Sequence, residues 1–201
     1  MVYINNITNN EIQFILTIFK NPKTEYNSNN LSKILGISRM GCLKIAKKLE
    51  NEKILILKIL GKAKFFRLDL SKDYVRNYVS FLLKRETEQS KAYVKVWVND
   101  LRNKISKANI AILFGSILTK GSEANDIDVL LVTNQKNFVN LKKEVEKINQ
   151  ISPKKLHPIY QSLQDLKDNI KKKDTVVLSI IKGVVVLGAE EFVELIKYDS
   201  N

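Results

Sequence analysis

The first part of the chain alternates apolar and polar residues with the period of an amphipathic helix. Between Thr8 and Lys20 the apolar positions recur at spacings of three and four residues. Thr8 precedes this pattern as a candidate N-cap, and Glu11, three residues further on, can complete a capping box with it. We therefore expect an amphipathic helix that packs its apolar side against a core.

Two further helical patterns follow close together. The segment 31–35 stops at Gly36, and glycine commonly ends helices. Ser38 is a suitable N-cap for a third helix that continues to about Asn51. Two helices joined by so short a turn form a candidate helix-turn-helix.

The pattern then changes to that of strands. Residues 54–59 and 64–70 are rich in branched and aromatic side chains, and the turn Leu60-Gly61-Lys62 separates them. These features predict a hairpin. Three helices followed by a hairpin is the order of elements in a winged helix.

The segment Leu31-Ser32-Lys33-Ile34-Leu35-Gly36-Ile37-Ser38-Arg39, with Leu49-Glu50-Asn51-Glu52-Lys53-Ile54, resembles the winged helix-turn-helix domains of archaeal and bacterial regulators. The resemblance covers residues 6–72 and implies that the third helix enters the major groove of double-stranded DNA. That helix would turn Leu43, Ala46 and Leu49 toward the core. The residues that would contact DNA are Ser38, Arg39, Lys44, Lys47 and Lys48 of the helix, with Lys62, Lys64 and Arg67 of the wing.

The segment 73–107 contains neither proline nor glycine and keeps a helical spacing of apolar residues. We expect two helices with a break near 85–90, forming a connector that is rigid and a candidate dimer surface. Trp97 lies on the apolar stripe, which favours a packing role over base stacking. The expected domains are thus 1–72, the connector, and 108–201.

The second half opens with a continuous apolar run, 109–114, which is typical of a strand buried on both faces. Gly115-Ser116 then leads into a short helix, a place where backbone N–H groups can hold phosphate. Asp126 and Asp128 begin a second strand and share one of its faces, because side chains alternate along a strand. Two carboxylates on one face repel each other unless a cation lies between them.

The run Leu113-Phe114-Gly115-Ser116, then Gly121, then Asp126-Ile127-Asp128-Val129-Leu130-Leu131-Val132 is similar to the signature of the DNA polymerase beta-type nucleotidyltransferase superfamily, in particular its minimal archaeal and bacterial members. The resemblance covers about residues 92–196. It implies that Gly115 and Ser116, with Lys120 nearby, hold nucleotide phosphates. It also implies that Asp126 and Asp128 bind Mg²⁺ or Mn²⁺, and that a nucleoside monophosphate passes from an NTP to a hydroxyl acceptor.

The chain departs from that signature at the third carboxylate, which active members present from a later strand. The candidate strand 155–161 contains no acid, and Asp165 and Asp168 fall in the next helical pattern. His157, the only histidine, occupies roughly the expected strand position and is a candidate base. The alternative is a polar strand residue with no catalytic role.

The remaining pattern completes an α+β chain in which a mixed sheet is flanked by helices. Helices are expected at 138–148, 163–170, 174–181 and 190–196, and a strand at 184–187.

The formal net charge of +13 lies almost entirely in the first half of the chain. Residues 1–107 contain 21 Lys and Arg against 9 Asp and Glu, whereas residues 108–201 contain 13 against 12. A basic first half favours contact with a polyanion over a solvated lysine-rich face alone. The absence of long apolar runs and of a secretory pattern, together with the single Cys42, predicts a cytoplasmic protein without a membrane segment.

These patterns leave more than one function open. The first is a DNA-binding protein with an active, metal-dependent nucleotidyltransferase domain that modifies a protein, an RNA or a small molecule. The second is a catalytically degenerate transcriptional regulator or antitoxin-like protein that uses the same fold for ligand sensing or dimerisation. An aminoglycoside-type resistance transferase is disfavoured, because a DNA-reading domain has no evident use there. A homodimer is the default expectation for a helix-turn-helix protein.

Overall fold

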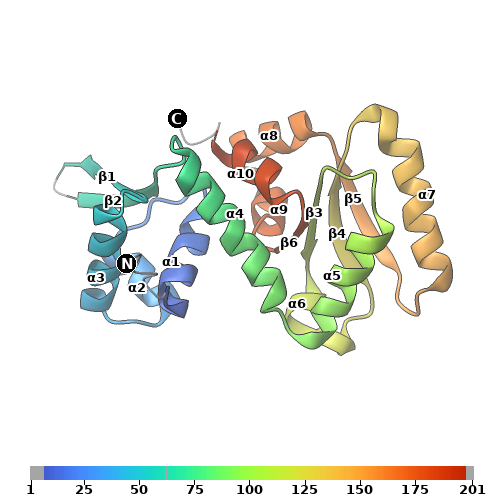
Figure 1. Ribbon diagram of the computed structural model, residues 1–201, viewed down its shortest axis with the longest axis horizontal. Coiled ribbons are helices and arrows are strands. Elements are labelled where there is room, and N and C mark those ends of the chain that lie inside the picture. The colour runs from blue at the N-terminus through green and yellow to red at the C-terminus, as the bar shows by residue number, and fades with distance from the viewer. Residues whose placement is uncertain (1–6, 62, 198–201) are drawn as a thin grey trace, which may run out of the picture. The chain divides into compact units, whose positions relative to one another are not determined.

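The computed structural model of the protein describes residues 7–61 and 63–197 (Figure 1). Lys62, which we expect in the wing, lies outside the described residues. The chain forms two compact units that divide between Val79 and Ser80, inside helix α4 (Asp73–Glu88). Within the described residues, no helix has both the length and the hydrophobicity needed to cross a membrane.

The first unit contains three helices and a hairpin in the predicted order, followed by the start of α4. The elements are α1 (Asn9–Phe19), α2 (Ser28–Leu35), α3 (Arg39–Asn51), β1 (Leu55–Leu60) and β2 (Ala63–Leu68). The strands β1 and β2 pair antiparallel, as expected for the hairpin. The amide of Phe66 also donates to the carbonyl of Tyr26 at 2.7 Å, so one residue between α1 and α2 bridges to β2.

The predicted start of α1, end of α2 and start of α3 are confirmed, whereas α2 begins at Ser28, three residues before the expected Leu31, because Asn27 caps it. The Thr8 side chain accepts from the amide of Glu11, and the Glu11 carboxylate accepts from the amide of Thr8, which closes the capping box. Gly36 ends α2 in the left-handed conformation at φ 65°, and the Ser38 side chain accepts from the amide of Gly41 at the start of α3. Local sequence therefore determines where these helices begin and end.

The buried side of α3 differs from the predicted one by a single position. Ala46 and Leu49 are buried as expected, but Leu43 is 40% exposed, and Cys42 occupies the core instead. Cys42, Ala46 and Leu49 follow one another at helical spacing. Leu43 is rotated about 100° from Cys42 around the helix axis, which takes it out of the core.

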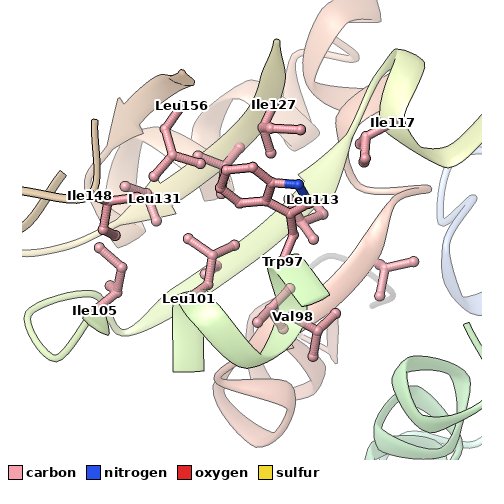
Figure 2. Close-up of a cluster of buried hydrophobic side chains, with 14 of the residues drawn as sticks. Trp97, Val98, Leu101, Ile105, Leu113, Ile117, Ile127, Leu131, Ile148 and Leu156 are labelled. Carbon is pink, nitrogen blue, oxygen red and sulfur yellow. The ribbon is translucent and has the colours of Figure 1, made fainter. Parts of the chain in front are cut away.

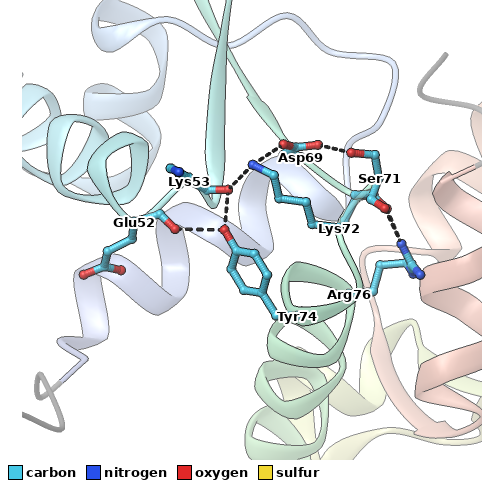
Figure 3. Close-up of polar contacts among 8 residues, drawn as sticks. Glu52, Lys53, Asp69, Ser71, Lys72, Tyr74 and Arg76 are labelled. Atoms are coloured by element: carbon cyan, nitrogen blue, oxygen red, sulfur yellow. Dashed lines mark hydrogen bonds and ion pairs between the residues drawn. The ribbon is translucent and has the colours of Figure 1, made fainter. Parts of the chain in front are cut away.

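The first turn of α4 is attached to the end of α3 by polar contacts (Figure 3). The Tyr74 hydroxyl is bonded to the carbonyl oxygens of Glu52 and Lys53 at 2.9 and 2.8 Å. Lys72 also donates to the Lys53 carbonyl, at 3.3 Å, and pairs with Asp69 at 2.7 Å. Lys53 has a left-handed conformation, φ 57°, which non-glycine residues seldom adopt, and the amides of Lys53 and Ile54 donate to the carbonyls of Glu50 and Leu49 there.

The second unit is built on a mixed four-stranded sheet flanked by helices, as predicted (Figure 1). Its strand order is β5 (Leu156–Gln161), β4 (Ile127–Val132), β3 (Ile110–Phe114), β6 (Val184–Leu187). β3 runs antiparallel to β4 and β6, whereas β4 and β5 are parallel. The helical segments are α5 (Ala92–Lys104), α6 (Ser116–Lys120), η1 (Gly121–Glu123), α7 (Gln135–Ile151), α8 (Leu163–Lys171), α9 (Thr175–Ile180) and α10 (Ala189–Lys197).

One face of this sheet is covered by α5 and α7. Ile127, Val129 and Leu131 of β4 join side chains of α5 and α7 in one buried cluster (Figure 2). Trp97 of α5 lies within this cluster and is 4% exposed, which confirms its packing role. The segment 73–107 is therefore divided between the two units, with α5 in the core of the second.

Glu11 supplies a test of what stabilises the first unit. Its side chain is buried and forms an ion pair with Lys48. The carboxylate also accepts a hydrogen bond from the amide of Thr8. Burial would raise the pKa of Glu11, but the hydrogen bonds from Lys48 and Thr8 together outweigh burial and lower it.

We predict that Glu11→Ala destabilises the protein by about 2 kcal/mol, because Lys48 loses its partner and α1 loses its capping box. Glu11→Gln should cost less, since an amide oxygen can still accept from Thr8. A lowered folded-state pKa means that the carboxylate stabilises the fold above pH ~4.5 and that this contribution is lost as pH falls through the folded-state pKa. Urea unfolding followed by circular dichroism at pH 7 and pH 3 measures both effects. Equal destabilisation at the two pH values would contradict the prediction.

Candidate metal and nucleotide site

The register of the sheet brings the two aspartates and the histidine together. Asp126 directly precedes β4, and Asp128 is the second residue of that strand. Both lie on the face opposite Ile127, which is fully buried. Asp128 pairs with His157 of β5 on one side and with Phe114 of β3 on the other, so the three residues form one row across the sheet.

The side chains of Asp126, Asp128 and His157 converge at the start of β4. The Nδ1 atom of His157 lies 3.1 Å from Oδ2 of Asp126. One potential ligand atom from each of Asp126, Asp128 and His157 lies within 4.8 Å of the other two. In residues 7–61 and 63–197, no other three Asp, Glu, His or Cys side chains converge in this way. Two carboxylate oxygens and an imidazole nitrogen form a donor set that fits a divalent cation.

The negative charges of Asp126 and Asp128 favour a cation between them. Burial, and secondarily the negative charge of Asp126, raises the pKa of Asp128, while His157 acts in the opposite direction. The half-buried carboxylate of Asp128 is therefore costly to ionise beside its neighbour. A positive ion between the two would offset that cost.

Gly115 lies directly against Asp128. Its φ of +75° is left-handed, and a Cβ atom built on it would lie 2.1 Å from Oδ2 of Asp128. Ser116 follows and begins α6, and Lys120, one helical turn later, lies on the same side of that short helix with its side chain exposed. The end of β3 thus brings Gly115, and with it the first residue of α6, to the candidate metal ligand Asp128.

Among the described residues, no third carboxylate joins Asp126 and Asp128. Asp165 accepts hydrogen bonds from the amide and hydroxyl of Ser162 in the capping box of α8, which also lowers its pKa. Asp168 accepts from the side chain of Gln164 at 3.0 Å. Both aspartates are held within α8, in agreement with the expectation that they do not reach the metal. His157 occupies the row position beside Asp128 on β5.

Lys154 is a residue of this region that sequence patterns do not indicate. Its ammonium group donates to the carbonyl oxygens of Ser122 and Ala124, in the loop that leads to Asp126. The amide of Ile127 donates in turn to the carbonyl of Lys155 at 3.0 Å. A lysine in a loop has no distinctive spacing, so only the folded structure reveals that it holds the loop before Asp126.

In the first unit, the candidate DNA-binding residues fall into two groups. The exposed ones are Ser38, Arg39, Lys44 and Lys47 of α3 and Lys64 of β2. Lys48 instead pairs with the buried Glu11, and Arg67 pairs with Glu25 at 2.8 Å. Glu25 also pairs with Lys58, so both basic residues of this cluster are partly neutralised.

A groove of about 590 Å³ lies between α3 and the hairpin of the first unit. Arg39, Leu43 and Lys47 line it from α3. Leu57 and Lys64 line it from the hairpin. Its lining is apolar in part, and its exposed charged side chains are the basic Arg39, Lys47 and Lys64 and the acidic Glu50.

Gly115 and Gly121 provide a matched pair of substitutions. Both have positive φ, but a Cβ at Gly121 would meet no atom within 4 Å, whereas one at Gly115 would overlap Asp128. We predict that each alanine variant is destabilised by about 1 kcal/mol through backbone strain. Gly115→Ala alone should also weaken Mn²⁺ binding, by at least about tenfold, because the new Cβ displaces the ligand Asp128. Calorimetric titration with Mn²⁺ and thermal unfolding of both variants measure this difference. Equal Mn²⁺ affinity in the two would show that Gly115 does not position Asp128.

Comparison with known proteins assigns no family to the chain. No protein-family model, curated protein or solved structure matches it. What the protein does must therefore be inferred from the chemistry of the residues that the fold brings together.

Proposed function

We propose that the second unit binds a divalent metal ion and a nucleoside triphosphate and transfers a nucleoside monophosphate to a hydroxyl acceptor, and that the first unit binds double-stranded DNA. One observation carries the catalytic part of the proposal: the glycine of the Gly115-Ser116 turn lies against Asp128, beside Asp126 and His157. The resemblance of these residues to the nucleotidyltransferase signature supports the same reaction. Mg²⁺ or Mn²⁺ is the expected ion.

Each residue has a distinct part in the proposed reaction. Gly115 allows the phosphate chain to approach the backbone, and the Ser116 hydroxyl can donate to a phosphate oxygen. Lys120, exposed one turn further on, contributes positive charge to the same side of α6. Asp126 and Asp128 would hold the ion, which when bound would supply positive charge to balance the triphosphate during displacement of pyrophosphate.

A second function is favoured by the absence of a carboxylate from β5. Active transfer needs a group that accepts the proton of the attacking hydroxyl. β5 offers only His157 next to Asp128, and Asp165 and Asp168 are engaged within α8. A protein that binds nucleotide and metal without transfer, and regulates transcription or acts as an antitoxin-like DNA-binding protein, would need no such group.

DNA binding is supported by the first unit's order of elements and by its exposed basic residues. The helix pair α2 and α3 is followed by a hairpin, and Tyr26 adds a bridge to β2, as in a winged helix. The exposed residues Arg39, Lys44 and Lys47 of α3 can reach phosphates or base edges. The alternative is a winged helix that only dimerises, in which these cations face solvent.

Transfer is tested by incubating the purified protein with α-³²P-labelled NTPs, Mg²⁺ or Mn²⁺, and a cell extract as the source of acceptors. We predict label in a protein or RNA band that disappears with Asp126→Asn and with Asp128→Asn, because either change removes a negatively charged metal ligand. Asp168→Asn, which lies outside the site, is the matched control and should retain labelling. Nucleotide binding without any labelling would reject transfer and leave the regulator.

DNA binding is tested by selecting a high-affinity duplex from a random pool and measuring its affinity at several salt concentrations. We predict that Lys47→Ala weakens binding to all duplexes. The slope of log K against log salt, which is negative, should become less steep by about 1, since one phosphate contact is lost. Lys143→Ala removes one exposed charge from α7 and is the control. A slope that is identical in both variants, or no binding at any salt concentration, would contradict a DNA-reading role for α3.

A further inference from the structure

His157 brings a nitrogen atom to a site whose other two ligands are carboxylates. Its strand, β5, is parallel to β4, and this pairing places it next to Asp128 on the same face. The side chain of His157 is 61% exposed, so no core packing requires an imidazole at this position. The same row position could have carried an acid without disturbing the fold.

The position of the ring suits metal ligation. Two neighbouring ligand atoms of an octahedral ion, each about 2.1 Å from it, lie roughly 3 Å apart. The distance from Nδ1 of His157 to Oδ2 of Asp126 is 3.1 Å. These two atoms are therefore already spaced like adjacent ligands of one ion, and Asp126, Asp128 and His157 each offer one ligand atom within 4.8 Å of the other two.

The chemistry of the nitrogen determines which ions are preferred. Mg²⁺ takes oxygen ligands and keeps much of its water, whereas imidazole suits divalent ions of the first transition row. We propose that His157 is a ligand in this site, and that Asp126, Asp128 and His157 together select first-row transition ions such as Mn²⁺ and Co²⁺ over Mg²⁺. This proposal rests on the metal site of the proposed function and states which divalent ions that site prefers.

Ligation by His157 also changes its part in the reaction. A nitrogen that donates its lone pair to an ion cannot accept a proton from a hydroxyl at the same time. Nδ1 of His157, which faces Asp126, is then not the general base. If His157 only hydrogen-bonds to Asp126 and binds no ion, the ring remains free to act as the general base. The ion preference of the site would then not depend on His157.

The test compares the full-length protein with His157→Asp and His157→Gln. Titration calorimetry gives the affinities for Co²⁺ and Mg²⁺, and the informative quantity is the ratio of the two within each variant. We expect His157→Asp to lower the Co²⁺ to Mg²⁺ ratio by about tenfold or more, because oxygen replaces nitrogen. His157→Gln, which lacks both imidazole and carboxylate, should weaken Co²⁺ binding by about tenfold or more. Because the side chain is exposed, both variants should unfold at the temperature of the wild type.

A second measurement observes the histidine directly. The chain contains a single histidine, so the ¹⁵N signals of a histidine-labelled sample report on His157 alone. Zn²⁺, a diamagnetic ion that imidazole also binds, should shift one ring nitrogen selectively, and Asp126→Asn should reduce that shift.

The outcomes separate this inference from the proposed function. Ion binding with an unchanged ratio in His157→Asp and no selective ¹⁵N shift would overturn the ligand role and leave nucleotidyl transfer intact. A changed ratio and a selective shift without transfer of label would uphold the ligand role and reject transfer. If no divalent ion binds the wild type, the ligand role and the metal-dependent reaction are both wrong.

Discussion

The buried position of β4 is the constraint on which the candidate site depends. β4 lies between β3 and β5, and Ile127 is fully buried on the face covered by α5 and α7. A shift of one residue in its pairing would turn Ile127 outward and carry Asp128 into an apolar cluster, which is strongly unfavourable. Core packing thus fixes the face from which the two carboxylates emerge, and the register with β5 fixes which residue meets them.

Local features of the chain could be predicted because their causes are local. The capping box of Thr8 and Glu11, the glycine at the end of α2 and the shared face of Asp126 and Asp128 each depend on a few neighbouring residues. The contact between His157 and Asp126 was not predictable in this way. The contact between His157 and Asp126 depends on β5 lying beside β4, and residue patterns along the chain do not indicate which strands are neighbours.

Side-chain pairing limits prediction in the first unit. Its basic residues look equivalent in the sequence, but Lys48 is paired with Glu11 and Arg67 with Glu25, while Lys47 is exposed. Partners more than thirty positions away decide which cations remain available, and spacing along a helix carries no information about them. The number of basic side chains left available to a polyanion is consequently smaller than the count of Lys and Arg suggests.

The close approach of Gly115 to Asp128 links two positions that are thirteen residues apart in the sequence. They share one small volume, so the main chain at the first and the carboxylate at the second cannot change independently. A lineage that lost the aspartate to a smaller residue would release the space at residue 115, although the left-handed backbone would still favour glycine. A side chain gained at 115 while Asp128 is kept would displace the carboxylate of Asp128 from its present position. The residue at 115 and the position of the carboxylate at 128 are therefore coupled through this one contact.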